Sequence, residues 1–319
     1  MKYRALGKTG LKVSEVGFGC WGIGKAMWKA DDEESRKALR KAVELGINFF
    51  DTAWVYGDGH SEKLVGELAK KSDIIIATKI PPKNRQWPAA LDADIEDLFP
   101  KEHIIRFARE SRKNLGRKID LLQLHVWTDK WAEGSESKAW QDAFQQLKQE
   151  GVAEFFGVSV NDHAPETALK LAESGKVDSL QVIYNIFDQS PEDELFKIAA
   201  RKKLGIIARV PFDEGALTGK LAYETKFDDW RKHYFGGERL KEAVDRAGKL
   251  RWLENGSRTL PQAALQFCLA NDAVSTVIPG MTKVRHVVDN AAASDGRLKA
   301  GELKRLRSHR WQKNFYDTL

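Results

Sequence analysis

The architecture of this chain is best inferred from Ile47-Asn48-Phe49-Phe50-Asp51-Thr52-Ala53-Trp54-Val55-Tyr56-Gly57. An apolar run here ends on an acid, and a phenol follows five residues later. We therefore expect Asp51 at the end of a strand and Tyr56 in the loop behind it. Two later apolar runs also end on protonatable side chains, Lys79 and His125. A carboxylate, a phenol, an amine and an imidazole at successive strand ends predict a catalytic ring.

Similar short apolar runs, bounded by turn residues, recur along the whole chain. An N-terminal hairpin is expected from Tyr3 to Leu11, with its turn at Gly7-Lys8-Thr9-Gly10. The runs are continuously apolar and do not alternate, which is typical of parallel strands covered on both faces. The eight expected strands are Val13–Gly19, Ile47–Asp51, Ile74–Lys79, Asp120–His125, Phe155–Val160, Ser179–Tyr184, Gly205–Val210 and Ser275–Gly280.

Segments with helical periodicity separate these runs. The alternation predicts an α/β fold, a (β/α)8 TIM barrel in one domain over residues 1–319. One stretch of about 50 residues, Phe212 to Thr259, is too long for a simple connection, and we expect a partly helical insertion after the seventh strand. The expected helices are Asp32–Leu45, Ser61–Ala69, Lys101–Leu115, Ser137–Glu150, Pro165–Ser174, Pro191–Lys203, Pro261–Ala270 and Val284–Ala293.

The composition is that of an ordinary globular protein, with 42% hydrophobic and 31% charged residues in 319. No window approaches the roughly 18 uninterrupted apolar residues of a membrane span, and no secretory signal is visible, so a cytoplasmic location is the default. The two cysteines indicate neither a disulfide framework nor a metal site. The net charge of +6 is spread over amphipathic helices with acids between, which disfavours nucleic-acid binding but suits an anionic cofactor.

The segment Gly17-Phe18-Gly19-Cys20-Trp21-Gly22 matches the G-x-G-x-x-G pattern of dinucleotide-binding Rossmann folds. That fingerprint requires a helix that opens within the glycines, so that the pyrophosphate meets its N-terminus. Here nine more residues precede the expected helix. We therefore interpret the glycines as part of the first barrel loop and not as a Rossmann site.

In a parallel barrel the carboxyl ends of the strands share one face, so Asp51, Lys79 and His125 should converge with Tyr56 above them. A nearby ammonium would lower the pKa of the phenol, and a carboxylate would keep the lysine charged and in position. The imidazole could hold a carbonyl oxygen by a hydrogen bond. This set suits protonation of a developing alkoxide, with hydride supplied by a nicotinamide.

Each residue also has a purely structural interpretation. Asp51 and Lys79 could form only an ion pair in the barrel mouth, Tyr56 could be a packing aromatic, and His125 could be a satisfied core histidine. Their joint placement at successive strand ends favours catalysis.

These motifs resemble the aldo-keto reductase superfamily over nearly the whole chain. The resemblance rests on the order of several specific segments. They are Leu11-x-Val13-Ser14-x-x-Gly17-x-Gly19, Asp51-Thr52-Ala53-x-x-Tyr56-Gly57, Ala77-Thr78-Lys79, Leu124-His125, Gly157-Val158-Ser159, Gln181-x-x-Tyr184-Asn185, Gly215-x-Leu217-Thr218-Gly219-Lys220 and Ile278-Pro279-Gly280.

The resemblance implies that Tyr56 is the general acid, Lys79 lowers its pKa, Asp51 holds Lys79, and His125 orients the carbonyl. It also implies NADP as cofactor, with NAD open, bound without a Rossmann domain. Ser159 and Gln181 would hold the nicotinamide amide. The implied cofactor-binding residues are Cys20, Trp21, Asp51, Ser159, Gln181, Arg209, Val210, Pro211, Phe212, Leu217, Lys220, Gly280, Thr282, His286, Asp289 and Asn290.

The chain departs from the family at three places. Val160 stands where many members have asparagine, and Arg209 where an aromatic often stacks on the nicotinamide. Many members carry a 2′-phosphate-reading arginine at the position of Thr282 or His286; Lys283 and Arg285 are nearby and could substitute.

Seven of the ten tryptophans fall in expected loops after strands, where barrel active sites are built. Collectively they predict an aromatic-walled pocket for a small sugar or an apolar carbonyl compound, although any one could merely pack a loop onto the barrel. The seven are Trp21, Trp28, Trp54, Trp87, Trp127, Trp131 and Trp230, and the expected substrate-binding residues are Trp21, Trp54, Tyr56, Trp87, His125 and Trp127.

Three functions remain open at this point. The leading one is NAD(P)H-dependent, reversible reduction of an aldehyde or ketone. A Schiff-base aldolase would use Lys79 as its nucleophile and need no cofactor. A cofactor-sensing regulatory subunit, similar to the potassium-channel beta subunits of the same superfamily, would bind nicotinamide nucleotide with negligible turnover. The oligomeric state cannot be read from these patterns.

Overall fold

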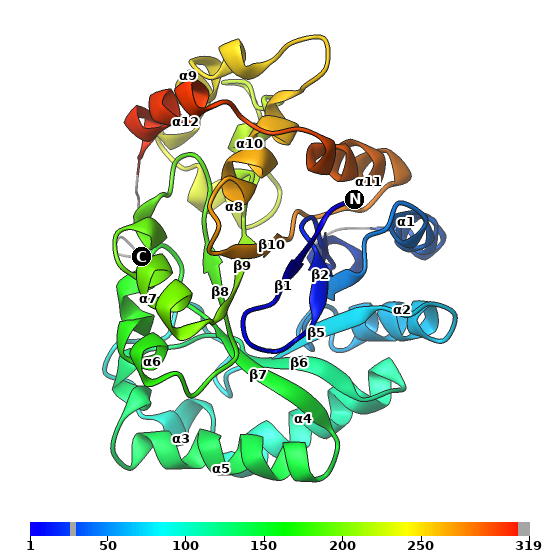
Figure 1. The fold of residues 1–319 in the computed structure, drawn as a ribbon, viewed down its shortest axis with the longest axis vertical. Coiled ribbons are helices and arrows are strands. Elements are labelled where there is room, and N and C mark those ends of the chain that lie inside the picture. Colours follow the sequence, from blue (N-terminus) through cyan, green and yellow to red (C-terminus); the bar gives the residue numbers. More distant parts are fainter. Residues whose placement is uncertain (26–29, 312–319) are drawn as a thin grey trace.

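Eight parallel strands form a curled sheet in the computed structural model, which describes residues 1–25 and 30–311 (Figure 1). The strand order is β10-β9-β8-β7-β6-β5-β4-β3. Parallel bridges from Val16 to Val277 and from Gly19 to Gly280 join the two ends, so the sheet closes into the expected barrel. The strands are β3 (Phe18–Gly19), β4 (Phe49–Asp51), β5 (Ile75–Ile80), β6 (Ile119–Leu124), β7 (Ala153–Ser159), β8 (Ser179–Ile183), β9 (Gly205–Arg209) and β10 (Val274–Val277).

The N-terminal hairpin is present, but the expected strand Val13–Gly19 is divided. Its first part belongs to β2 (Lys12–Ser14), which pairs antiparallel with β1 (Tyr3–Ala5), and only β3 enters the barrel. The division occurs because the chain changes partners at Glu15, whose N–H donates to the Lys2 carbonyl (3.0 Å) while its own carbonyl accepts from the Val277 N–H (2.9 Å). Apolar continuity does not reveal such an exchange of partners.

The hairpin covers the amino-terminal end of the barrel. Leu6 and Val13 are fully buried and belong to one apolar cluster with barrel residues Phe49, Leu121 and Ile207. This packing excludes water from one end of the barrel, which leaves the carboxyl ends of the strands as the open end for a site.

Helices surround the strands, as Figure 1 shows. Asp31 caps the first of them by accepting a hydrogen bond from the Glu34 N–H (2.9 Å). Within the described ranges, no helix is long and apolar enough to span a bilayer. The helices expected between strands are α1 (Asp32–Glu44), α2 (His60–Ala69), α4 (Lys101–Leu115), α5 (Glu136–Gln149), α6 (Leu169–Ser174), α7 (Leu195–Lys202), α10 (Leu260–Leu269) and α11 (Val284–Ala291).

Two expected helices begin differently from the prediction. Pro165 and Pro191 lie in separate 3-10 turns, Pro165–Ala168 and Ser190–Glu192, ahead of α6 and α7. The insertion after β9 is partly helical, with the 3-10 segments Asp213–Thr218 and Arg251–Leu253 and the helices α8 (Arg231–Tyr234) and α9 (Arg239–Gly248). Two helices were not foreseen, α3 (Ile95–Leu98) and α12 (Ala300–Leu306).

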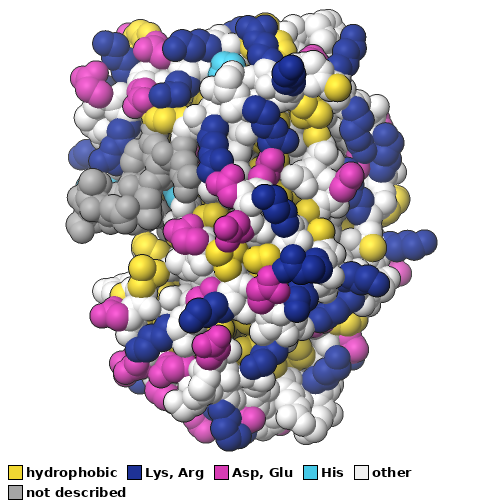
Figure 2. All heavy atoms as spheres, turned by 60° about the vertical axis from the view of Figure 1, so that its left-hand side comes forward, with side chains coloured by type: hydrophobic (Ala, Val, Ile, Leu, Met, Phe, Trp, Pro, Cys, Tyr) yellow, Lys and Arg dark blue, Asp and Glu magenta, His cyan; other side chains and the backbone are white. Residues whose placement is uncertain are grey.

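Charged side chains of both signs are interspersed on the face shown in Figure 2. Many are in ion pairs, such as Arg109 with Glu150 and Arg36 with Glu67. This distribution agrees with the interpretation that the positive net charge belongs to solvated helix faces.

Candidate active site

Four side chains meet at the carboxyl ends of β4, β5 and β6. Lys79 Nζ donates to Asp51 Oδ2 at 2.6 Å and lies 3.4 Å from Tyr56 Oη. The ring of His125, the residue after β6, stands edge-on to the ring of Tyr56 with centroids 6.0 Å apart. The lysine therefore lies between the carboxylate and the phenol, and the imidazole borders the phenol.

Hydrogen bonds to the backbone and to strands β6 and β8 fix the positions of Asp51 and Lys79. Lys79 Nζ also donates to the Thr52 carbonyl at 2.8 Å. The second carboxylate oxygen, Asp51 Oδ1, accepts from Gln181 Nε2 on β8 at 2.8 Å. Gln123 Nε2 lies 3.5 Å from the same oxygen. Because partners on three other strands or loops contact Asp51 and Lys79, neither side chain can turn without breaking a buried hydrogen bond.

Lys79 is fully buried, yet it stays charged. Burial alone would lower the pKa of Lys79, but Asp51 and then Tyr56 outweigh burial, so the pKa is raised. An ammonium ion held in this way can act on its neighbours by charge and by hydrogen bonding, but not as a free amine.

The pKa of Tyr56 departs from the expectation. Burial raises the pKa of the phenol above its ordinary value, and Lys79 is the largest influence in the opposite direction. Lys79 lowers the pKa as expected, but desolvation of the phenolate exceeds the attraction of the ammonium, so the net shift is upward. The consequence is a phenol that keeps its proton near neutral pH.

The imidazole of His125 is neutral near pH 7, and one of its ring nitrogens makes no hydrogen bond to a described residue. Burial, Lys79 and Arg209 hold its pKa well below the ordinary value. Its Nδ1 is buried and has no hydrogen-bond partner among the described residues. A buried polar nitrogen without a partner is uncommon in folded proteins, and here it suits a group that meets a ligand.

The first barrel loop supports the phenol by close backbone contact. Gly57 has φ +73°, and a Cβ at this position would lie 1.9 Å from the Gly24 carbonyl oxygen. After β3 the chain forms a short 3-10 turn, Trp21–Ile23, and α1 begins only at Asp32. Gly24 therefore permits close packing against the loop of Tyr56. No α-helix opens within Gly17–Gly22, which confirms that these glycines form no Rossmann fingerprint.

Tryptophans border the Tyr56–His125 pair on two sides. The ring of Trp21 lies 6.5 Å from that of Tyr56, and Trp230 of the insertion lies 5.9 Å from Trp21. On the other side Trp87 is 36% exposed, its ring centroid is 5.3 Å from that of His125, and its Nε1 donates to the His125 carbonyl (2.6 Å).

Other tryptophans have different surroundings. Trp127 and Trp131 have no exposed surface and pack edge-to-face 5.6 Å apart, so in this structure they are core residues and not pocket walls. Trp54 turns toward α4, where its ring meets Phe107 at 4.7 Å. Trp28 lies outside the described residues.

The residues expected around a nicotinamide are at neighbouring strand ends. Ser159 and Gln181 are nearly fully buried and paired in register on β7 and β8. Arg209 at the end of β9 forms an ion pair with Asp162 and donates to the Val160 carbonyl at 2.9 Å. Val160 thus contributes through its backbone, since its side chain offers no amide.

The loop after β9, expected to meet the pyrophosphate, has unusual backbone geometry. Val210, Asp213 and Glu214 have φ of +54°, +45° and +55°. Positive φ is rare for residues other than glycine, and for a β-branched residue it is an outlier that clusters at functional sites. Pro211, Phe212 and Leu217 lie in the same loop, between Arg209 and Lys220.

The residues expected at the adenosine end lie between β10 and α11 and along α11 itself. Burial, and then Arg285, Lys220 and Lys283, lower the pKa of His286, so one cation of the loop after β9 and two at the start of α11 act on one imidazole. The Thr282 Oγ1 lies 3.4 Å from His286 Nδ1. Gly280 bridges to Gly19, Asn290 is buried, and the Asp289 carbonyl accepts from Gln262 Nε2.

Cys20 cannot contribute its thiol to this site. Its side chain is fully buried, and Sγ lies 3.6 Å from the Phe18 carbonyl. Burial, and then Asp51, raise the pKa of the thiol well above its ordinary value. Any contact of Cys20 with a cofactor would therefore involve only its backbone.

The sequence analysis did not assign Gln123, Asp162 or Glu214 to the site. It named Trp230 only as a loop tryptophan and did not foresee its contact with Trp21. Gln123 precedes the end of β6 by one residue and was absorbed into an apolar run. Asp162 lies two residues after the expected strand end Val160, and this spacing could have indicated it. Glu214 gave no signal, because its importance depends on neighbours distant in the sequence.

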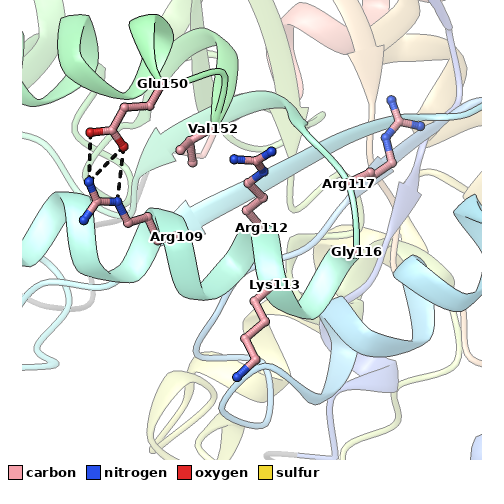
Figure 3. Close-up of a pocket in the computed structure, with 7 residues that line it drawn as sticks. All are labelled: Arg109, Arg112, Lys113, Gly116, Arg117, Glu150 and Val152. Carbon is pink, nitrogen blue, oxygen red and sulfur yellow. Dashed lines mark hydrogen bonds and ion pairs between the residues drawn. The ribbon is translucent and has the colours of Figure 1, made fainter.

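Two cavities lined by the described residues lie away from the four catalytic candidates. One, of about 370 Å³, lies at the amino-terminal side of β6 and β7; its basic side chains do not converge, since Arg109 turns to Glu150 while Lys113 points away (Figure 3). The other, of about 350 Å³, is lined by Trp54, Phe107, Lys83 and Arg106 among others.

Comparison with known proteins gives consistent matches. The model of the Aldo/keto reductase family matches residues 15–310. The "Uncharacterized oxidoreductase YqkF" of Bacillus subtilis is 31% identical, covering 97% of this chain and 96% of that protein. The "Probable voltage-gated potassium channel subunit beta" of Arabidopsis thaliana is 28% identical, covering 92% of each chain. Among solved structures, the glycerol dehydrogenase AKR11B4 from Gluconobacter oxydans superposes with a TM-score of 0.79 at 25% identity, covering 97% of this chain and 94% of that one.

Proposed function

The chain belongs to the aldo/keto reductase family, and from this membership we propose that it reduces an aldehyde or ketone to an alcohol with NAD(P)H, reversibly, with Tyr56 as general acid. One observation carries the proposal. The Lys79 ammonium joins Asp51 to Tyr56, beside a neutral His125 whose Nδ1 has no partner among the described residues.

The proton transfer follows from the pKa directions. Tyr56 keeps its proton near neutral pH, since the pKa of a phenol is ordinarily about 10 and burial raises it further. As a carbonyl oxygen gains negative charge, the phenol can give up its proton, and Lys79 stabilises the phenolate that forms. Asp51 keeps Lys79 charged and stationary during this step.

His125 would orient the carbonyl. A neutral imidazole can donate one hydrogen bond without bringing a charge into the site. Its ring borders Tyr56, so one carbonyl oxygen can meet both donors. Two donors aimed at the same oxygen lower the barrier through electrostatic stabilisation of the alkoxide.

The residues at the carboxyl end of the barrel suit the cofactor nicotinamide adenine dinucleotide phosphate. Such a cofactor supplies the hydride. Ser159 and Gln181, paired in register on β7 and β8, would hold the nicotinamide amide, and the Gln181 amide nitrogen also donates to Asp51. Lys220, Lys283 and Arg285 act together on His286, and such a group of cations suits a 2′-phosphate and favours NADP over NAD.

The substrate pocket is proposed to lie between the Trp21–Trp230 pair and Trp87. Flat aromatic faces suit the apolar face of a sugar or polyol as well as an aromatic aldehyde. The relative named glycerol dehydrogenase favours a polyol or sugar. Trp54 and Trp127, expected as walls from the sequence, are left out of this proposal because of their packing.

The competing functions differ in measurable ways. A Schiff-base aldolase requires a neutral Lys79, whereas Asp51 and Tyr56 raise the pKa of Lys79. A cofactor-sensing subunit is supported by the similarity to a potassium-channel beta subunit, and it would bind NADPH with negligible turnover.

The test is turnover of NADPH with a panel of sugars, polyols and aromatic aldehydes, using the wild type and Tyr56→Phe. We expect the variant to lose about 10²- to 10⁴-fold in the rate of carbonyl reduction while its Kd for NADPH stays the same. Full activity of the variant would contradict the general-acid role. Tight NADPH binding by the wild type without turnover on any substrate would favour the sensing subunit.

A further inference from the structure

A second ion pair lies at the same end of the barrel as the catalytic candidates, on β9 and the loop after β7, whereas Asp51 and Lys79 lie on β4 and β5. Arg209, the last residue of β9, pairs with Asp162 in the loop after β7. The guanidinium also donates to the Val160 carbonyl at 2.9 Å. The side chain of Arg209 is 16% exposed and that of Asp162 is 23% exposed, so the pair is largely shielded from water.

The charge of Arg209 reaches the catalytic residues. It contributes to lowering the pKa of His125 and opposes the rise in the pKa of Tyr56. Arg209 ends β9 at the same carboxyl end of the barrel as Asp51, Lys79 and His125, where the proposed site lies. It stands at the position where family members often have an aromatic that stacks on the nicotinamide.

A second carboxyl nearby does not neutralise Arg209 at neutral pH. Burial, and then Asp213 and Asp162, raise the pKa of Glu214 to about 8, so this carboxyl is largely protonated at pH 7. Asp213 accepts a hydrogen bond from Tyr234 Oη at 3.0 Å. Asp162, by contrast, is a carboxylate in direct contact with the guanidinium.

We propose that Asp162 sets the preference of this site between oxidised and reduced cofactor by neutralising Arg209 beside the nicotinamide ring. The inference rests on the proposed function, since it assumes that a nicotinamide binds here. The oxidised ring carries a positive charge and the reduced ring carries none. An unneutralised guanidinium would therefore repel the oxidised form and leave the reduced form almost unaffected.

Asp162 acts through Arg209 and is a positioning residue in this proposal. The planar guanidinium can stack on a ring only if it is held flat, and two acceptors, the Asp162 carboxylate and the Val160 carbonyl, hold the same nitrogen. Charge balance and orientation thus come from the same contact.

The experiment measures Kd for NADP⁺ and for NADPH by quenching of tryptophan fluorescence at pH 7 in low salt. In Asp162→Asn we expect the ratio Kd(NADP⁺)/Kd(NADPH) to rise roughly tenfold over the wild type. In Arg209→Met the ratio should fall below the wild type, because Asp162 is then left uncompensated near the oxidised ring. The double variant should return close to the wild-type ratio.

The outcomes separate this inference from the function itself. If Asp162→Asn binds NADPH as the wild type does and the ratio stays unchanged, Asp162 does not set the preference, and the proposal is overturned. If Asp162→Asn does not fold, an unchanged ratio in Arg209→Met overturns it equally. If the wild type binds neither nucleotide, the proposed function fails first.

Discussion

Replacement of Asp51 by Asn tests the buried pair on which the site depends. The change keeps the shape of the side chain and removes its charge, while Lys79 remains buried with 0% side-chain exposure. The ammonium then loses the partner at 2.6 Å that outweighs its desolvation. Breaking a buried pair by removing one partner typically costs about 3 to 5 kcal/mol, because a charge is left uncompensated.

The pH dependence gives the sign of the effect. In the wild type the folded-state pKa of Lys79 lies above its unfolded value, so its stabilising contribution is present throughout neutral pH and is lost only as pH rises through the folded pKa. In Asp51→Asn burial dominates and the pKa of Lys79 falls below the unfolded value. The folded variant then binds fewer protons than the unfolded chain, so its stability rises with pH from about 7 to 10.

The assay is urea unfolding of wild type, Asp51→Asn, Lys79→Met and the double variant at pH 7 and pH 9.5. We expect Asp51→Asn to lose about 3 to 5 kcal/mol at pH 7 and to recover part of it at pH 9.5. The double variant should regain more than half of the loss, since no charge is left unpaired. A loss below about 1 kcal/mol, or the same loss at both pH values, would refute the argument that Lys79 depends on Asp51 for its charge.

Three further results are expected. Glu214→Gln should make the protein more stable than the wild type by up to roughly 5 kcal/mol at pH 9 and by less than about 1 kcal/mol at pH 5. The reason is that a carboxyl whose folded pKa is raised to about 8 loses stability as pH rises from its unfolded value through 8; parallel pH profiles in thermal unfolding would contradict this. Lys283→Ala combined with Arg285→Ala should raise Kd for NADPH about tenfold and leave Kd for NADH nearly unchanged, and equal losses for both nucleotides would argue against recognition of a 2′-phosphate. Trp230→Ala should raise KM for the preferred substrate about tenfold with a smaller change in kcat, whereas an unaltered KM would remove the insertion from the substrate pocket.

Local patterns were sufficient to predict the barrel and its ring of polar residues. A continuous apolar run that ends on Asp51, Lys79 or His125 specifies both a buried parallel strand and the chemistry at its end, because all strands of a barrel run the same way. The five-residue gap to Tyr56 is likewise a local fact. The convergence of these four side chains therefore follows from periodicity and order along the chain.

Contacts between loops could not be obtained in this way. Arg209 and Asp162 are 47 residues apart and meet only because β7, β8 and β9 bring two strand ends together. The raised pKa of Glu214 depends on desolvation and then on Asp213 and Asp162. The difference between Trp87 and Trp127 depends on which side of a loop faces the core. Hydrophobic periodicity reports only whether a residue is covered, whereas charge, desolvation and ring contacts depend on distances across the closed barrel. The strands and the position of Tyr56 behind one of them are thus properties of the chain itself, and the electrostatic balance around Tyr56 arises only when the barrel closes.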